Sequence, residues 1–367
     1  MVQHVALTGA NGFLGWHVRA ALQGIGMETT AIPVGEAFDG ETAACAISAS
    51  TRLVHLAGVN RGSDAEVSGG NTRFANQLAE AIGRAEVPPA VIVYASSSQA
   101  GNGSVYGNAK AAAAGILRNA ADKVGSDFLE ITLPNLFGEH GRPFYNAVTA
   151  TFSHMLAQGQ SPTVADDKIL TLLHAQDAAD LLIGAGDVTA GQGLEAHESV
   201  SGLLARLTEI DSIYRRGEIP DVTAKFDRDL FNTYRSYVFP AQAPVQLTRH
   251  SDARGSFFEI IRSHGGSGQS SFSTTQPGIS RGDHFHRRKI ERFTVLAGSA
   301  TIALRKLFTD EIFEFQVTGD EPVAVDIPTM WAHRITNTGP DLLYTSFWTN
   351  DIFDPSSPDT IEEVVLK

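Results

Sequence analysis

The segment Thr8–Gly15 (TGANGFLG) places three glycines between an apolar strand, Val2–Leu7, and the start of a helix. Glycines at such a turn let the backbone approach a pyrophosphate, whose charge is attracted by the free N–H groups of the helix N-terminus. A glycine-rich segment alone could be an ordinary tight turn, but its place between strand and helix favours a binding turn. We therefore expect a parallel α/β sheet that binds a dinucleotide here. The expected cofactor contacts of this turn are Gly9, Asn11, Gly12, Phe13, Leu14 and Gly15.

Short apolar runs alternate with Ala-rich stretches through the first part of the chain, as in a doubly wound parallel sheet. The expected strands are Val2–Leu7, Leu53–Ala57, Ala90–Tyr94 and Phe128–Leu133, and the expected helices are Gly12–Gln23, Asn71–Arg84 and Gly107–Val124. The pattern changes at Val238–Pro244, whose two prolines suit neither a helix interior nor a sheet interior. Short aromatic and β-branched runs follow, among them Phe257–Ile261, and predict a β-barrel or sandwich. We expect two domains, residues 1–243 and residues 244–367.

The charge and the cysteine content exclude several classes of protein. The chain has 28 basic and 41 acidic residues, and this net charge of -13 would repel nucleic acid and anionic membrane surfaces. The single cysteine, Cys45, excludes an internal disulfide and suits a reducing cytoplasm. The sequence has neither a basic, apolar leader nor an apolar run of about 18 residues. We expect a soluble cytoplasmic protein that neither enters a membrane nor binds nucleic acid.

Tyr106 and Lys110 have the i, i+4 spacing that places two side chains on one face of a helix. The charge of the lysine is expected to lower the pKa of the phenol. A phenol with a near-neutral pKa can donate a proton to a carbonyl oxygen as hydride arrives, which a phenol with a pKa of about 10 does poorly. This spacing also occurs by chance, and the glycine turn upstream is what favours catalysis. We predict that Tyr106 and Lys110 are catalytic.

These features resemble the extended short-chain dehydrogenase/reductase family. The segment Leu53–Gly58 (LVHLAG) resembles a strand end that packs beside the adenosine, which implies cofactor contacts from Leu56, Ala57 and Gly58. A serine completes the family's site, and the segment Tyr94–Ser98 (YASSS) ends the preceding strand. Alignment of the motif implies Ser97, with Ser96 and Ser98 left open.

Two further segments bear on the same site. The segment Pro134–Gly138 (PNLFG) resembles the family's stretch between nicotinamide and sugar, which implies that Asn135 contacts substrate, although Pro-Asn also occurs as a plain turn. The segment Thr29–Gly35 has no acidic residue to bind a ribose diol, which favours NADP over NAD. It has no arginine for a 2′-phosphate either, so the choice of cofactor stays open.

Gly278, His284, His286, Glu291 and Gly298 satisfy every fixed position of the first cupin motif. On a strand the two histidines of an HxH sequence point the same way. The second cupin motif supplies His333 as a fourth expected ligand, although Met330 and Pro322 replace two of its glycines. Three imidazoles and a carboxylate suit Zn²⁺, with iron, manganese and nickel left open. A degenerate cupin without metal is the alternative.

The segment Asp252–Glu259 (DARGSFFE) resembles the deoxysugar epimerase branch of the cupins, which implies that Arg254 and Glu259 line a sugar-nucleotide pocket. The segment Arg281–His284 (RGDH) resembles that branch's "RGxH", in which the histidine is a base without metal. A metal-bound nitrogen cannot also take a proton from carbon. We therefore favour the metal role for His284, substrate binding for Arg281, and Lys289 as the candidate base.

Over nearly its whole length the chain resembles the CapF-type bifunctional enzymes of capsular polysaccharide and O-antigen synthesis. The resemblance implies a UDP-linked 2-acetamido-2,6-dideoxy-4-hexulose as substrate, epimerisation at C3 in the cupin domain, and reduction of the C4 ketone with NADPH in the Rossmann-like domain. The implied product is UDP-N-acetyl-6-deoxytalosamine. A homodimer is also implied, because both parent families usually pair. The alternatives are a single-activity reductase or epimerase with a structural cupin, and a dinucleotide-sensing sugar-binding protein that is not an enzyme.

Overall fold

The computed structural model describes residues 4–185 and 193–366, and the chain forms two compact units. The first unit consists of Met1–Leu136 with Leu170–His197, and the second of Phe137–Ile169 with Glu198–Lys367. The boundary predicted between residues 243 and 244 therefore falls inside the second unit. The first residues of the strand expected over Val2–Leu7, Val2 and Gln3, lie outside the described residues.

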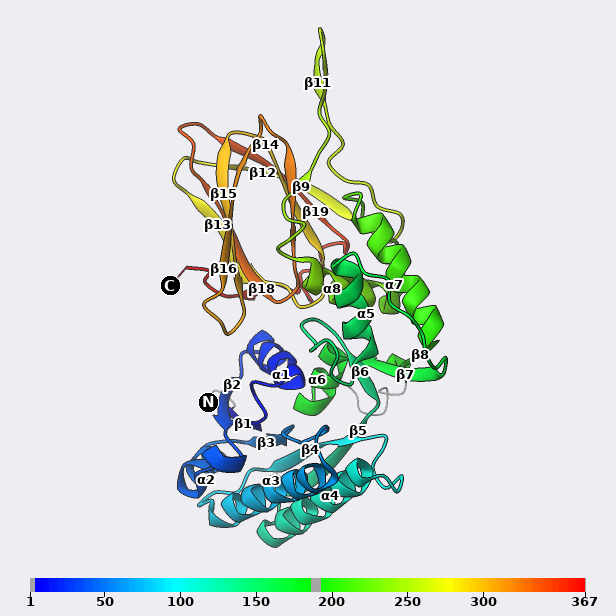
Figure 1. Ribbon diagram of the computed structural model, residues 1–367. Coiled ribbons are helices and arrows are strands. Elements are labelled where there is room, and N and C mark those ends of the chain that lie inside the picture. Colours follow the sequence, from blue (N-terminus) through cyan, green and yellow to red (C-terminus); the bar gives the residue numbers. More distant parts are fainter. Residues whose placement is uncertain (1–3, 186–192, 367) are drawn as a thin grey trace. The chain divides into compact units, whose positions relative to one another are not determined.

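The first unit is built on a parallel sheet in the order β2-β1-β3-β4-β5 (Figure 1). Its strands are β1 (His4–Thr8), β2 (Glu28–Ile32), β3 (Arg52–His55), β4 (Val91–Ser97) and β5 (Asp127–Leu133). Because β2 and β3 lie on opposite sides of β1, the strand order reverses at β1. Ligands of open α/β sheets bind at the carboxyl ends of the strands at such a point. The predicted Rossmann-like sheet is confirmed.

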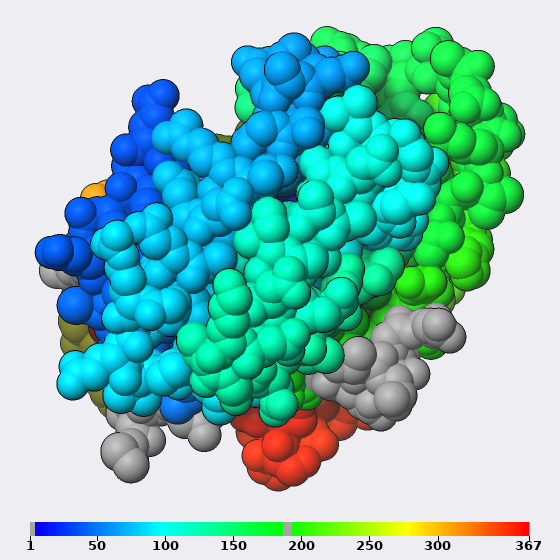
Figure 2. All heavy atoms as spheres, turned by 90° about the horizontal axis from the view of Figure 1, so that it is seen from below, coloured from blue at the N-terminus to red at the C-terminus, as the bar shows by residue number. Residues whose placement is uncertain are grey.

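Helices cover both faces of this sheet. The helices are α1 (Phe13–Gly24), α2 (Gly40–Ser48), α3 (Asp64–Arg84), α4 (Val105–Val124) and α6 (Ala175–Ile183), with a short 3₁₀ helix, η1 (Gly35–Ala37). Since side chains alternate along β1, Val5 and Leu7 pack with α1 and α6, whereas Ala6 packs with α2, α3 and α4. The outer surfaces of α3 and α4 are seen in Figure 2, in light blue and turquoise.

The second unit is an antiparallel β-structure with three helices, and the predicted cupin-like fold is confirmed. Its two five-stranded sheets have the orders β12-β19-β14-β17-β9 and β16-β15-β18-β13-β20. The strands are β9 (Val245–Gln246), β12 (Gln269–Thr275), β13 (Ser280–Phe285), β14 (Glu291–Ala297), β15 (Ser299–Lys306), β16 (Ile312–Thr318), β17 (Val323–Ile327), β18 (Trp331–Asn337), β19 (Leu343–Thr349) and β20 (Ile361–Glu362). Apolar side chains of both sheets, among them Phe293, Leu304 and Ile335, form one buried core.

A two-stranded hairpin precedes this barrel, made of β10 (His250–Asp252) and β11 (Gly255–Phe257), and all six of its strand residues are exposed. The strand predicted over Phe257–Ile261 is wrong, since β11 ends at Phe257. Three short strands, β6 (Asn135–Phe137), β7 (Ile169–His174) and β8 (Ala196–Ser199), form a separate sheet in the order β6-β7-β8. Among the described residues, no helix is both long enough and apolar enough to cross a membrane.

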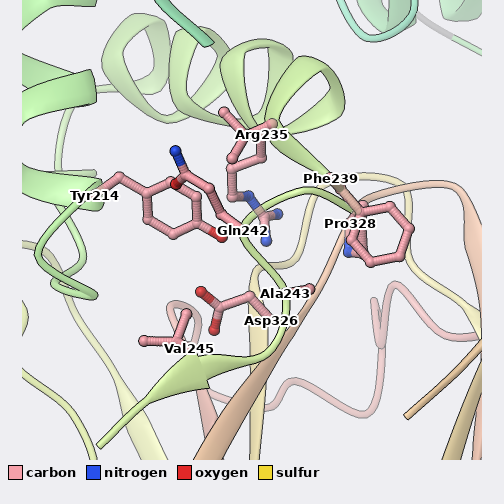
Figure 3. Close-up of a pocket in the computed structure, with 9 residues that line it drawn as sticks. Tyr214, Arg235, Phe239, Gln242, Ala243, Val245, Asp326 and Pro328 are labelled. Atoms are coloured by element: carbon pink, nitrogen blue, oxygen red, sulfur yellow. The ribbon is translucent and has the colours of Figure 1, made fainter. Parts of the chain in front are cut away.

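The helices of the second unit, α5 (Val148–Ala157), α7 (Val200–Tyr214) and α8 (Lys225–Val238), belong with the barrel rather than with the residues before them. Arg235 of α8 donates to the Ile327 carbonyl oxygen of β17 at 2.9 Å. Figure 3 shows Arg235, Tyr214 of α7 and Asp326 of β17 around a cavity of about 10 Å³, room for about one water molecule. These buried polar contacts explain why the predicted boundary at residue 243 does not divide the compact units.

Candidate functional site

The turn after β1 has the geometry of a dinucleotide cradle. Gly9 has a φ of +71°, and a Cβ atom there would lie 2.9 Å from the Ala57 nitrogen. A Cβ atom at Gly15 would lie 2.0 Å from the Gly9 carbonyl oxygen, so any larger residue would push the turn open. Gly12 caps α1 without a side-chain hydrogen bond, which leaves the N–H groups of the first turn available to an anion. These residues fit a pyrophosphate at the carboxyl ends of β1 and β3.

The remaining predicted cofactor contacts surround this cradle. Asn11 is exposed in the turn, and Phe13 and Leu14 are the first residues of α1. The backbone N–H groups of Leu56 and Ala57 donate to Thr8 Oγ1 at 3.1 and 3.3 Å, which fixes the end of β3 beside the end of β1. A Cβ atom at Gly58 would lie 2.9 Å from Asn71 Oδ1.

Tyr106 lies in the first turn of α4, and the Ser97 side chain at the end of β4 lies near enough to its hydroxyl to lower its pKa in part. The two neighbouring serines are placed differently. Ser96 is buried and donates to Glu130 Oε1 at 2.8 Å, whereas Ser98 is exposed. Of the three serines left open by the sequence, Ser97 is the one whose side chain acts on the pKa of the tyrosine.

Lys110 is 5% exposed on α4, one helical turn after Tyr106. Its ammonium donates to the Ala95 carbonyl oxygen at 2.6 Å and lies 4.3 Å from the centre of the Tyr94 ring. Burial, only partly offset by Glu130, lowers the pKa of Lys110 to about 8. Burial raises the pKa of Tyr106, and the Ser97 side chain lowers it only in part. The predicted lowering of the phenol's pKa by Lys110 is thus not met in this structure, because the ammonium is directed to Ala95.

Asn135, the predicted substrate contact, is exposed on β6, where its side chain donates to the Thr171 carbonyl oxygen at 3.1 Å. His55, at the end of β3, is 1% exposed, and its Nδ1 lies 2.6 Å from Thr8 Oγ1. Burial lowers the pKa of this histidine to about 3, so it is a neutral core residue.

In the second unit, the four predicted metal ligands come together. His284 lies in β13 and His286 directly follows the end of that strand. Glu291 begins β14, and His333 lies on β18 directly opposite His284. One potential ligand atom from each of the four residues lies within 4.8 Å of the others. His286 and His333 are almost fully buried, whereas His284 is partly open. A buried three-imidazole, one-carboxylate cluster with one open side is a donor set that suits zinc and related metals.

The hydrogen bonds of the two buried histidines fix which ring nitrogen faces the cluster. Nδ1 of His286 lies 2.6 Å from the Asp359 carbonyl oxygen, and Nδ1 of His333 lies 3.2 Å from the Trp331 carbonyl oxygen. A carbonyl oxygen only accepts, so in each neutral ring the proton is on Nδ1. The two Nε2 lone pairs then face Glu291 Oε2 at 3.0 and 3.1 Å. Lone pairs facing a carboxylate need positive charge between the atoms, which either a metal ion or a proton on each Nε2 supplies.

The protonation states of the ligands agree with metal binding. Burial, together with His333 and His286, lowers the pKa of His284 to about 4, which leaves its imidazole neutral near pH 7. Burial alone would raise the pKa of Glu291, but its contacts with His286 and His333 outweigh that effect and hold the pKa well below its usual range. A metal takes neutral imidazoles and ionised carboxylates, and His284 and Glu291 have these protonation states near pH 7.

Two other residues predicted to line the sugar pocket, Arg254 and Glu259, form local ion pairs. Arg254 is on the exposed β10–β11 hairpin, paired with Asp252, and its side chain is 90% exposed. Glu259 forms an ion pair with Arg262. Arg254 and Glu259 thus form ion pairs with residues near them in sequence, and neither ion pair includes a residue of the metal cluster.

Two predicted residues are closer to the cluster in sequence. Arg281 of β13 donates to Thr275 Oγ1 at 3.1 Å and to the Thr274 carbonyl oxygen at 3.0 Å. Lys289 directs its ammonium to the Pro358 carbonyl oxygen at 2.9 Å and to Thr360 Oγ1 at 3.3 Å. The lysine named as a base is therefore committed to another segment of the chain.

Sequence reasoning missed Asp359, which contacts His286 from 73 positions later in the chain. No spacing rule relates the two residues, and the only local sign is a Pro-Asp pair that reads as a turn. Met330, in contrast, was noted where the second cupin motif has a glycine. Met330 has a left-handed conformation, with a φ of +61°, which glycine adopts more readily than methionine, and its N–H donates to the His286 carbonyl oxygen at 2.7 Å.

Comparison with known proteins divides the chain in the same order as its motifs. Residues 5–191 match the NAD dependent epimerase/dehydratase family, and residues 250–361 match the polysaccharide biosynthesis C-terminal domain. A Pseudomonas aeruginosa protein named UDP-2-acetamido-2,6-beta-L-arabino-hexul-4-ose reductase is 32% identical over 367 residues, which is 97% of each chain. The spore coat polysaccharide biosynthesis protein SpsL of Bacillus subtilis is 28% identical over 123 residues, which cover 31% of this chain and 82% of that one.

A solved structure is similar over the whole length. The crystal structure of the capsular polysaccharide assembling protein CapF from Staphylococcus aureus is 30% identical to this chain, with a TM-score of 0.60. The match covers 99% of this chain and 100% of that one. The similarity thus includes both units and both clusters of candidate residues.

Proposed function

The chain belongs to the CapF-like proteins, which join an NAD dependent epimerase/dehydratase domain to a polysaccharide biosynthesis C-terminal domain, and we propose that it reduces the C4 ketone of a UDP-linked 2-acetamido-2,6-dideoxy-4-hexulose. The proposed product is UDP-N-acetyl-6-deoxytalosamine, for surface polysaccharide synthesis. The relative from Pseudomonas aeruginosa is named a reductase of such a 4-hexulose, which supports this substrate class. A cytoplasmic location and a homodimer stay predictions from the sequence.

The observation that carries the reductase proposal is that Ser97 at the end of β4 and Tyr106 in the first turn of α4 lie at the same edge of the parallel sheet as the glycine cradle. A nicotinamide dinucleotide bound at Gly9, Gly12 and Gly15 would supply the hydride. The hydroxyl of Tyr106 gives its proton to the C4 oxygen, so that the ketone becomes an alcohol. The Ser97 hydroxyl donates a hydrogen bond to the same oxygen and stabilises its developing charge. Lys110, one helical turn after Tyr106, is assigned to the ribose of the dinucleotide in this proposal, because its ammonium does not lower the pKa of the phenol in this structure.

NADPH is the proposed cofactor, because the chain after β2 offers no acidic side chain to a ribose diol at Pro33, Val34 or Gly35. Kinetics with each dinucleotide test this choice. We expect a lower KM for NADPH than for NADH, and the reverse order would assign NAD.

The metal cluster supports a second activity, epimerisation at C3 of the same sugar. A divalent metal held by His284, His286, Glu291 and His333 would polarise a carbonyl oxygen and so make the neighbouring C–H more acidic. The chain's own part is to bring three imidazoles and one carboxylate together around that position, with His284 neutral and Glu291 ionised. Lys289 is not the base in this proposal, because its ammonium is hydrogen-bonded to Pro358 and Thr360.

Incubation of the purified protein with the 4-hexulose and NADPH tests both activities together. We expect loss of the NADPH absorbance and a product whose NMR couplings show inversion at C3. Consumption of NADPH without inversion would leave a single-activity reductase with a structural cupin. Binding of the dinucleotide without any turnover would favour the dinucleotide-sensing alternative and refute the enzyme.

A further inference from the structure

The segment Pro358–Val365 lies along the strand that carries the proposed metal ligands. We infer that this segment is the outer shell of the metal site, and that Asp359 is the positioning residue for His286. The inference rests on the metal site proposed above and adds to it a residue outside the ligand set. Within the second unit, Figure 1 shows the end of the chain, in red, beside β13.

Asp359 contacts the stretch from His286 to Lys289 with both its backbone and its side chain. Its carbonyl oxygen accepts from Nδ1 of His286 at 2.6 Å. Its carboxylate accepts from three successive backbone N–H groups, those of Arg287, Arg288 and Lys289, at 3.0, 2.8 and 2.7 Å. The three N–H bonds place Asp359 where its own carbonyl meets the imidazole. Side chain and backbone therefore act together on His286.

The other end of the ligand strand is held by the same segment. Asp283 is a non-glycine residue with a φ of +58°, at a bulge just before His284. Its carbonyl oxygen accepts from the Glu363 N–H at 2.9 Å, and its carboxylate accepts from the Val365 N–H at 3.0 Å. Directly before Glu363, β20 pairs with β13, with Glu362 opposite His284. The bulge that directs His284 toward the cluster is thus supported from Pro358–Val365.

The segment is itself anchored in the barrel. Arg305 of β15 is 3% exposed, and its guanidinium donates to the carbonyl oxygens of Val365 at 3.0 Å and Val364 at 2.6 Å. Lys289 donates to Pro358 at the other end. A buried guanidinium that is hydrogen-bonded to successive carbonyls holds the segment in one place. The acceptor for His286 therefore has a fixed position before any metal binds.

The two buried ligands differ in how their rings are oriented. His333 directs Nδ1 to the carbonyl of Trp331, two residues away on its own strand, whereas His286 depends on a distant residue. An acceptor at Nδ1 fixes the tautomer and the ring orientation that present Nε2 to a metal. Loss of such a partner typically weakens metal affinity by about 10- to 100-fold. Removal of Asp359 should therefore act on His286 and leave the four ligands chemically intact.

Substitutions at Asp359 separate its charge, its hydrogen bonds and its backbone conformation. Its φ of +43° is one that glycine and asparagine tolerate better than alanine. Asp359→Gly keeps the backbone but removes the carboxylate, and Asp359→Asn keeps an oxygen acceptor without the charge. Asp354→Ala is the matched control, because that carboxylate lies in the same part of the chain and accepts from the backbone and side chain of the neighbouring Ser356.

The test is a zinc titration of the full-length protein against a chromophoric chelator, together with the absorption spectrum of the cobalt-substituted protein. We expect Asp359→Gly and Asp359→Ala to raise the Kd for zinc by about 10- to 100-fold and to alter the cobalt spectrum. Asp359→Asn should restore most of the affinity, and Asp354→Ala should match the unchanged protein. A general packing role would not be rescued by one acceptor oxygen.

The outcomes separate this inference from the metal site on which it rests. Zinc affinity and cobalt spectra unchanged in Asp359→Gly would overturn the inference while leaving the metal site in place. If Asp359→Ala does not fold, Asp359→Gly decides, because glycine tolerates the backbone conformation. An unchanged protein that binds no zinc at all would overturn the metal site and the inference together, whereas NADPH oxidation in the first unit would be unaffected.

Discussion

The guanidinium of Arg292 donates two hydrogen bonds to the carboxylate of Asp326, at 2.6 and 2.8 Å, and the two residues are 1% and 5% exposed. A third hydrogen bond joins Arg292 to the Gly217 carbonyl oxygen at 2.8 Å, just beyond the end of α7. The pair therefore connects two strands of the barrel with the helical part of the second unit. A buried ion pair destabilises the folded state far less than a single buried charge without its partner.

Replacing Arg292 by methionine should lower the free energy of unfolding by about 3–5 kcal/mol, because the Asp326 carboxylate would remain buried without its partner. Urea denaturation of the two proteins measures the difference. Arg254→Met is the control, since that arginine is 90% exposed beside Asp252 and its replacement should leave the stability nearly unchanged. Equal effects of the two substitutions would contradict a special role for the buried pair.

Replacing Tyr106 by phenylalanine removes the proposed proton donor without changing the shape of α4. The rate of NADPH oxidation with the 4-hexulose should fall by about 10²- to 10⁴-fold, the usual contribution of a positioned acid. Zinc content should be unchanged, because the metal ligands lie in the other unit. Tyr344→Phe, at an exposed position of β19, should keep full activity. Full activity in Tyr106→Phe would exclude Tyr106 as the donor.

Replacing His286 by alanine removes one of the four proposed ligands. Bound zinc, measured by atomic absorption, should fall well below one ion per chain. A metal at 100 times its Kd stabilises the folded state by about 2.7 kcal/mol, so EDTA should lower the Tm of the unchanged protein and not that of the variant. Reduction of an already epimerised ketone should persist. His250→Ala, on the exposed β10, is the control, and a full zinc content in His286→Ala would contradict the ligand set.

Local spacing predicted much of both sites because it reflects local geometry. The glycines of Thr8–Gly15 meet a steric limit that only Gly satisfies, and an HxH sequence on a strand brings two imidazoles to one side. Contacts between segments that are distant in the sequence have no characteristic spacing from which they could be predicted. The bonds from Asp359 to His286, and from Arg235 to Ile327, join residues 73 and 92 positions apart.

The lysine of the YxxxK sequence illustrates a second limit. Its spacing from Tyr106 places both residues on one face of α4, as predicted. The direction of its ammonium is set by two groups of β4, the carbonyl oxygen of Ala95 and the ring of Tyr94. Helical periodicity carries no information about the neighbouring strand, so the sequence predicted the position of Lys110 and not its electrostatic effect.

The buried ammonium of Lys110 should make stability depend on pH in a defined window. Burial lowers its pKa to about 8 in the folded protein, from 10.5 in the unfolded chain. Between these two pH values the folded state binds fewer protons than the unfolded chain. The free energy of unfolding therefore increases as pH rises from about 8 to 10.5. Below pH 8 the charged, buried ammonium destabilises the folded state. Lys110→Met lacks this group. Its stability relative to the unchanged protein should be highest near pH 7 and decrease by on the order of 3 kcal/mol toward pH 10.5, since each pKa unit corresponds to about 1.4 kcal/mol.

Urea denaturation at several pH values measures this difference in stability. Lys123→Met is the control, because Lys123 is an exposed lysine of the same helix. Parallel pH profiles for Lys110→Met and the unchanged protein would show that Lys110 is not held in a low-dielectric environment.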